Sequence, residues 1–295
     1  MNNELQTISN IVSRNGKRGV RTIVDLEDSL EIPGAPEQTA TSRVVAREKL
    51  KSLFYMHKQH TMLGVRINHI SGKDFELDIK CLQQLRIQLD NLVLPKVNSA
   101  AELQHYYDAV KNISCDELIV LLETVEGLQQ LDEIMALAKS LGISKIHFGH
   151  WDYFLSNDRY PIPAQDCTTF WEVVAPLMHT LAAAGFTYIH PPVNRLTDFQ
   201  FLSAVINHIR LSGITNFGIS TLTNGQSKHA LINTHIADPL VLVSAEPANK
   251  LSHALTLIET FQSSRYSFCI TDDQVFVAPH EYWAAKKYIA QCSNK

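Results

Sequence analysis

The stretch from Leu118 to Asp152 constrains the fold of this chain more than any other. It contains an apolar run at Leu118–Leu122, a helical apolar pattern over Leu128–Leu141, and a second short apolar run at Lys145–Phe148. This succession predicts two buried parallel strands joined by a helix in a right-handed crossover.

An acidic residue follows each of these two predicted strands. Glu123 comes directly after the first strand, and Asp152 lies just beyond Gly149, which ends the second. Parallel neighbours direct their carboxyl ends to one rim, where α/β sheets and barrels carry their chemistry. Two carboxylates there can hold a divalent cation, or they can be solvated acids at the start of loops. These two residues alone favour neither interpretation.

The same alternation of strand and helix recurs at least seven times along the chain. Strands are predicted near 20–25, 62–67, 91–94, 186–189 and 217–222, and helices near 5–14, 39–57, 74–88, 100–111, 168–184, 197–211 and 248–263. Thr39 is the predicted N-cap of its helix, and Asn224-Gly225 is a predicted turn. An alternating pair of segments over 266–277 and a helix over 279–291 complete the chain. Seven or eight such units favour a closed (β/α)8 barrel over an open doubly wound sheet.

Composition and charge exclude several classes of function. The chain has 295 residues, 45% hydrophobic and 19% charged, and a net charge of −4. Because no basic run is long enough to follow a phosphate backbone, nucleic acid is not an expected partner. No apolar run reaches membrane-spanning length and the N-terminus lacks a signal pattern, so we expect a cytoplasmic protein. Five cysteines without a Cys-x-x-Cys pair predict reduced thiols.

Charged side chains also end the other predicted strands. Glu27 and Asp28 follow the first strand, Arg66 ends the second, and Lys96 follows the third. An arginine at such a rim can grip a substrate carboxylate through two parallel hydrogen bonds, or it can pair with a surface acid.

Two histidines are also candidate metal ligands. His147 and His150 have a spacing that zinc ligands use, but His147 lies inside a predicted strand, which argues against zinc. His190 is expected to be a structural histidine at a strand end, and whether His280 lines a subunit contact is left open.

Six motifs occur in an order that resembles the HpcH/HpaI aldolase and citrate lyase beta-subunit family. They are Asp25-Leu26-Glu27-Asp28-Ser29, Arg43 with Ala46-Arg47, Val65-Arg66-Ile67-Asn68, Leu94-Pro95-Lys96-Val97, Leu122-Glu123-Thr124 with Gly127, and Phe148-Gly149 with Asp152. The resemblance continues through Gly218–Leu222 with Gln226 and Asn233, and through Val275–Pro279. It thus covers nearly the full chain.

The resemblance implies a TIM barrel that binds Mg²⁺ through Glu123 and Asp152. It also implies cleavage or formation of a carbon–carbon bond in a 2-oxo acid or acyl-thioester adduct through an enolate. Arg66 would hold the substrate carboxylate, with Gly149 and Trp151 also at the substrate, although Trp151 could equally pack on the barrel rim.

Further catalytic roles fall to the charged strand ends. Glu27 and Asp28 would orient water or the arginine, and Lys96 could share either role or pair with those acids. The family is commonly trimeric, so a homotrimer or hexamer is expected. The barrel is assigned to residues 1–235, and residues 236–295 are assigned to a C-terminal hairpin and helix extension.

Departures from the family pattern leave a second hypothesis open. The first barrel strand is missing, very short or supplied otherwise. Val277 stands where relatives that use acyl-CoA have an aspartate, Ser156 replaces a second acid, and Thr223-Asn224-Gly225 replaces a His-Pro. These changes leave the metal pair whole but put the acyl-CoA half of the reaction in doubt. The alternative is a catalytically retired family member that serves as a subunit or scaffold.

Overall fold

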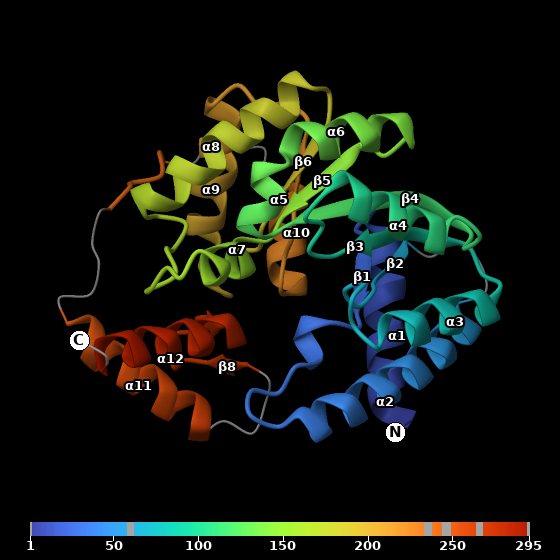
Figure 1. Cartoon of the computed structure of the whole chain (residues 1–295), viewed down its shortest axis with the longest axis horizontal. Coiled ribbons are helices and arrows are strands. Elements are labelled where there is room, and N and C mark those ends of the chain that lie inside the picture. Colours follow the sequence, from blue (N-terminus) through green and yellow to red (C-terminus); the bar gives the residue numbers. More distant parts are fainter. Residues whose placement is uncertain (1, 58–61, 233–237, 244–248, 264–267, 294–295) are drawn as a thin grey trace. The chain divides into compact units, whose positions relative to one another are not determined.

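The structure is a computed structural model that describes residues 2–57, 62–232, 238–243, 249–263 and 268–293 (Figure 1). The chain divides into two compact units. Unit 1 comprises Met1–Leu122 and Glu126–Lys145, and unit 2 comprises Glu123–Val125 and Ile146–Lys295. The predicted division at residue 235 falls within 233–237, which lies outside the described residues, and it stays a prediction.

Unit 1 contains four parallel strands that follow one another in chain order. Their pairs are β1 with β2, β2 with β3, and β3 with β4. The elements are α1 Asn2–Lys17, β1 Thr22–Asp25, the 3₁₀ turn η1 Asp28–Leu30, α2 Pro36–Met56, β2 Leu63–Arg66, α3 Phe75–Leu85, β3 Leu89–Leu94, α4 Ala100–Val110, β4 Cys115–Leu122, α5 Val125–Gln129 and α6 Leu131–Ser140. Strands β2 and β3 and the second half of β4 are largely buried; Leu92, Leu94, Val120 and Leu122 are fully covered, as expected where both faces of a parallel sheet are packed. Strand β1 is only partly covered, with Ile23 42% exposed.

Unit 2 continues the alternation and adds the C-terminal elements. Strand β6 pairs with β7 in parallel, and β8 forms an antiparallel pair with β9. The elements are β5 Lys145–Phe148, α7 His150–Ser156, α8 Thr168–Ala183, β6 Thr187–His190, α9 Phe199–Leu211, β7 Phe217–Ile219, α10 Asn224–Ile232, α11 Lys250–Ser263, β8 Cys269–Ile270, β9 Phe276–Val277 and α12 Pro279–Ser293.

This architecture confirms the predicted α/β class with a C-terminal hairpin and helix. Within the described residues, the predicted strand-and-helix alternation supplies seven strands, β1 to β7, and no strand precedes α1. No described helix combines the length and the apolar character needed to cross a membrane.

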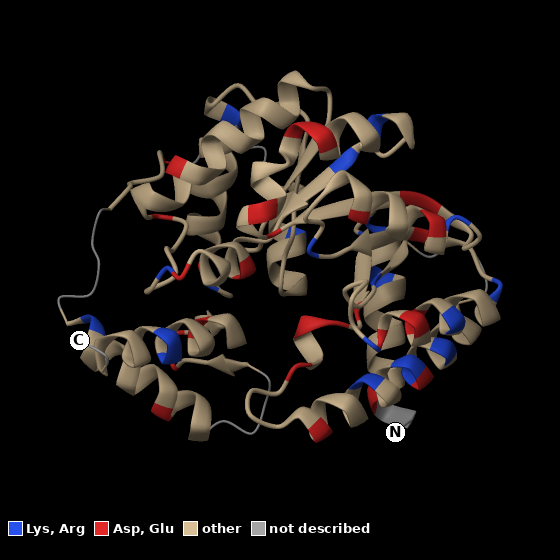
Figure 2. Cartoon of the chain, viewed as in Figure 1, with Lys and Arg blue, Asp and Glu red and all other residues tan. Residues whose placement is uncertain are grey.

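The helices of the two units differ in how much charge they carry (Figure 2). Helix α2 has six charged residues among its 21, whereas α8 has one, Glu172, among its 16. A helix that is apolar almost all round must be covered by other elements. Helix α8 accordingly buries Phe170, Trp171, Val174 and Leu177, and it forms the core of unit 2.

Three local predictions were wrong. Helix α2 begins at Pro36 rather than at Thr39, because proline at the first position fixes a helical φ; the Thr39 hydroxyl instead accepts the Ile32 N–H at 2.9 Å. Asn224-Gly225 opens helix α10, because the Thr223 hydroxyl accepts the Gln226 N–H at 3.2 Å and caps it. The predicted helix over 128–141 is interrupted at Gln130, where φ and ψ leave the helical region.

Candidate functional site

Five charged side chains of unit 1 meet at the carboxyl ends of β1, β2 and β3. We call Asp25, Glu27, Asp28, Arg66 and Lys96 the ionic cluster. The parallel register of β1 and β2 places Asp25 opposite Arg66. Arg66 donates from Nε and Nη2 to the two oxygens of Asp25 at 2.7 and 2.5 Å, and from Nη1 to Asp28 at 3.1 Å. The arginine fork is thus held by a carboxylate of its own chain.

Lys96 completes the ionic cluster. Its ammonium lies 2.9 Å from Glu27 Oε1 and 2.8 Å from Asp28 Oδ1. The Lys96 backbone has a φ of +50°, a region that L-residues with side chains rarely occupy. Such a conformation persists only where its surroundings fix it, and it is enriched at functional sites.

The charges in the ionic cluster stabilise one another. Burial raises the pKa of Asp25, but the charge and hydrogen bonds of Arg66 outweigh it and bring the pKa below its ordinary value. Burial lowers the pKa of Arg66, yet Asp25, Asp28 and Glu27 together raise it well above normal. The structure therefore brings together the four predicted catalytic residues of unit 1. Sequence reasoning missed Asp25 as a fifth member, although its place at a strand end was a usable signal.

In unit 2, Glu123 lies against Gly149. Glu123 is 2% exposed, and a Cβ atom placed on Gly149 would lie 2.3 Å from Glu123 Oε2 and 2.7 Å from Glu123 Cβ. Real Cβ atoms essentially never come this close to another atom. Glycine is therefore required at position 149 for lack of space, and it fixes where the Glu123 carboxylate can lie.

Asp152 lies in the first turn of α7, not in a loop as its predicted position just beyond the strand implied. The Asp152 Oδ2 atom is 3.0 Å from His280 Nε2, and helix α12, which carries His280, packs on α7. Trp151 stacks on His280, with ring centroids 6.5 Å apart and planes 12° apart, and it also contacts Phe276. We call Glu123, Gly149, Asp152 and His280 the carboxylate–histidine site. His280 was not predicted as a site residue; its only signal was its position directly after the Ala278-Pro279 tail motif.

The donors of the carboxylate–histidine site suit a hard divalent cation. Glu123 is a buried carboxylate, and Asp152 is a second carboxylate within the same unit. Carboxylate oxygens are the protein ligands that Mg²⁺ prefers. An imidazole beside a ligating carboxylate is a common means of orienting it.

His190 has the structural role expected of it. It is fully buried, with Tyr188 Oη 3.0 Å from Nδ1 and Gln165 Oε1 3.2 Å from Nε2. His147 lies within 3.1 Å of the Ser220 hydroxyl. None of the five cysteines has a disulfide partner in the described residues.

Comparisons with known proteins agree with this architecture. The family model for HpcH/HpaI aldolase/citrate lyase matches residues 21–190, which is more than half of the chain. None of the curated proteins compared with the chain matches it.

Several solved structures share the fold. RipC from Yersinia pestis is 25% identical, with a TM-score of 0.55 over 75% of this chain and 92% of RipC. CitE from Mycobacterium tuberculosis, in complex with magnesium, acetoacetate and coenzyme A, is 16% identical, with a TM-score of 0.57 over 97% of this chain and 94% of CitE. The citrate lyase beta subunit from M. tuberculosis, complexed with oxaloacetate and magnesium, is 18% identical, with a TM-score of 0.55 over 76% of this chain and 90% of that chain.

Proposed function

Because the chain belongs to the HpcH/HpaI aldolase/citrate lyase family, we propose that it is a magnesium-dependent carbon–carbon lyase or aldolase. Its substrate is a 2-oxo acid or an acyl-thioester adduct, and the reaction passes through an enolate. The observation that carries the proposal is the pairing of Glu123 with Gly149 and of Asp152 with His280 within one unit. The relatives crystallised with magnesium and acetoacetate or oxaloacetate support the same ligand classes.

Glu123 and Asp152 are assigned to the metal. Bound there, Mg²⁺ supplies a Lewis acid that stabilises negative charge on a substrate oxygen. Gly149 leaves room for the Glu123 carboxylate, and His280 holds Asp152 in one orientation. Trp151, stacked on His280, is assigned to the wall of the substrate pocket.

Arg66 is assigned to the substrate carboxylate, with Lys96 in support. Glu27 and Asp28 orient both cations through the hydrogen bonds of the ionic cluster. Because the Arg66 fork already holds Asp25, a substrate carboxylate would meet an arginine whose position and charge are fixed in advance. The side chain of Val277 cannot act as a general acid or base. The proton transfer that the family resemblance gives to an aspartate at this position therefore needs another group here.

Calorimetry tests the metal assignment. Magnesium and then oxaloacetate, pyruvate or glyoxylate are titrated into the wild type, Asp152→Asn and Glu123→Gln. We expect a 2-oxo acid to bind only with magnesium present, and both variants to lose that binding while keeping the fold. If Glu123→Gln keeps the lyase activity of the wild type in an activity assay, the metal assignment is wrong. If the wild type binds neither metal nor acid, the alternative of a catalytically retired scaffold gains the support.

The oligomer and the compartment remain proposals of the same kind. We propose a cytoplasmic homotrimer or hexamer, on the family resemblance and on the predicted role of residues 236–295 as an extension. Sedimentation velocity of the purified chain distinguishes these assemblies from a monomer.

A further inference from the structure

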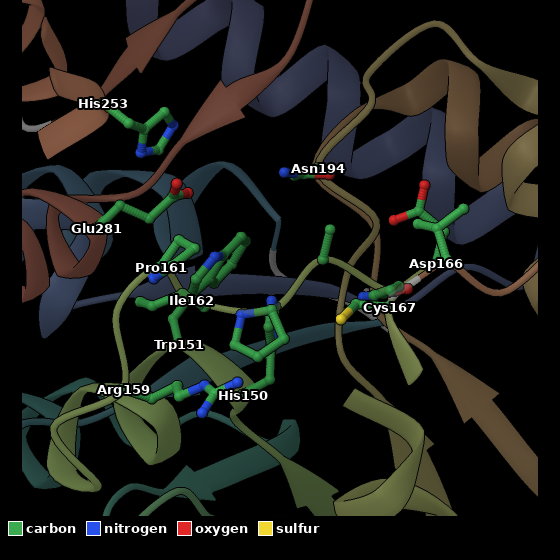
Figure 3. Close-up of a pocket in the computed structure, with 14 residues that line it drawn as sticks. His150, Trp151, Arg159, Pro161, Ile162, Asp166, Cys167, Asn194, His253 and Glu281 are labelled. Carbon is green, nitrogen blue, oxygen red and sulfur yellow. The ribbon is translucent and has the colours of Figure 1, made fainter. Parts of the chain in front are cut away.

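Unit 2 contains a cavity of about 230 Å³ that is lined by neither proposed metal ligand, although it shares Trp151 with the proposed substrate pocket (Figure 3). Helices α11 and α12 contribute His253 and Glu281 on one side, and loops contribute Asp166, Cys167 and Asn194 on the other. The segment ending at Val243 closes another part of the wall, because Val243 exchanges backbone hydrogen bonds with Asp166 and Thr168. The cavity is smaller than the pockets that hold drug-sized ligands, so its ligand is small.

Two contacts with groups outside the cavity position parts of its lining. The Tyr160 hydroxyl lies 2.6 Å from His253 Nδ1, which fixes the imidazole on the wall. The backbone N–H of Arg159 donates to Phe154 O at 2.9 Å and positions the start of the loop. Trp151, Pro161, Ile162 and Pro163 supply an apolar part of the lining.

The imidazole of His150 contributes a buried atom that lacks a hydrogen-bond partner among the described residues. His150 is 4% exposed and lines the cavity, and its Nδ1 makes no hydrogen bond within the described part of the chain. Leaving a buried polar group unpaired costs free energy, and native proteins rarely do so without a reason. A ligand atom in the cavity would remove that cost.

We propose that this cavity is a binding site for a short-chain carboxylic acid, with its carboxylate on Arg159 and its remaining polar group against Glu281, His253 or His150. A guanidinium binds a carboxylate with charge-assisted, often paired hydrogen bonds. The apolar lining takes the hydrocarbon chain. The site binds its ligand without magnesium, so it does not depend on the proposed lyase activity.

Glu281 does not oppose an anion here. Burial raises the pKa of Glu281 to about 7, although the Ala278 N–H and His280 act in the opposite direction. Around neutral pH a large fraction of Glu281 is therefore uncharged and able to donate a hydrogen bond.

Butanoate, 3-hydroxybutanoate and the neutral isostere butanamide test the proposal. Binding to the magnesium-free full chain is followed through the indole N–H resonance of Trp151, assigned with Trp151→Phe. We expect 3-hydroxybutanoate to bind most tightly and butanamide to bind at least tenfold more weakly than butanoate. Equal affinity for butanoate and butanamide, or no shift with any of the three, overturns the proposal.

Two substitutions distinguish binding in this cavity from binding at the proposed metal site. Arg159→Gln should weaken butanoate binding at least tenfold, whereas the matched control Arg210→Gln, on the exposed part of α9, should leave it unchanged. Asp152→Asn should retain butanoate binding even though it removes a proposed metal ligand. Loss of butanoate binding in Asp152→Asn would instead assign the acid to the metal site and refute a separate one.

Discussion

The ionic cluster of unit 1 and the carboxylate–histidine site of unit 2 hold their acids in different ways. In the ionic cluster, the cations Arg66 and Lys96 are bound by three acids. In unit 2, Glu123 is fixed by the space that Gly149 leaves, and Asp152 meets an imidazole. The acids of the ionic cluster are thus placed by cations, whereas a glycine and an imidazole help to place the two carboxylates of unit 2.

Removing Arg66, the central cation of the ionic cluster, should destabilise the fold strongly. Arg66→Gln would leave Asp25, Glu27 and Asp28 close together without it. Breaking a fully buried pair costs about 3–5 kcal/mol, and because a fifth of the Arg66 side chain is exposed we expect the lower part of that range. Urea unfolding measures the loss.

Arg21→Gln provides the matched control for Arg66→Gln. Arg21 pairs with Asp90 and Glu117 on the surface, with 38% of its side chain exposed. A surface pair of this kind contributes about 0–1 kcal/mol. Equal losses in the two variants would mean that the ionic cluster is an ordinary surface network.

The carboxylate–histidine site should instead respond to shape. Gly149→Ala adds a methyl group that would overlap Glu123, so the carboxylate or the backbone must move. Overpacking of this kind costs about 1–3 kcal/mol, and magnesium affinity should fall with it. Gly218→Ala is the control, since its Cβ would lie 3.6 Å from Ile189, an ordinary contact. If magnesium affinity is the same in both variants, Gly149 does not shape the metal site.

Most of the fold could be predicted from the sequence, because short apolar strands and periodic helices are local patterns. Strand Lys145–Phe148 and helix Thr168–Ala183 were predicted within a residue. The start of α10 was missed because a single hydroxyl, that of Thr223, decides between a turn and a helix.

The candidate site was predicted in part for a related reason. Glu27, Arg66 and Lys96 lie at strand ends, and strand ends can be read from apolar patterns, so their meeting in one cluster was foreseeable. His280 contacts Asp152 only because α12 packs on α7, a contact between segments 128 residues apart that no local pattern encodes. His280 was therefore missed because its contact depends on the fold, whereas Asp25 was missed although its strand end could be predicted.

A substitution of His280 tests whether its imidazole orients Asp152. If it orients Asp152, His280→Gln should weaken magnesium binding by about 10–100-fold without loss of fold, the usual effect of removing a group that orients a metal ligand. Calorimetry with magnesium measures the change. His179→Gln, on the exposed face of α8, should bind magnesium as the wild type does. If His280→Gln binds magnesium as tightly as the wild type, His280 does not orient Asp152 for the metal.

The raised pKa of Glu281 should make the stability of unit 2 depend on pH. The folded pKa of Glu281, about 7, lies above the value of about 4.3 expected for the unfolded chain, so the folded state binds the proton more tightly. Stability is unaffected by this group below pH 4, declines as pH rises from about 4.3 to 7, and levels off above that.

In the ionic cluster the sign is opposite. The folded pKa of Asp25 is lowered, so its stabilisation is present above the unfolded value and is lost as pH falls through the folded one. Urea unfolding of wild type, Glu281→Gln and the exposed control Glu259→Gln between pH 4.5 and 8 isolates the contribution of Glu281, because the stabilisation by Asp25 is lost only at lower pH. The free energy of unfolding of wild type minus that of Glu281→Gln should fall across this range, while the difference from Glu259→Gln should stay flat. If the difference in unfolding free energy is flat for both variants, the pKa of Glu281 is not raised in the folded state. Its carboxyl would then be charged near neutral pH and could not assist the binding of an anion.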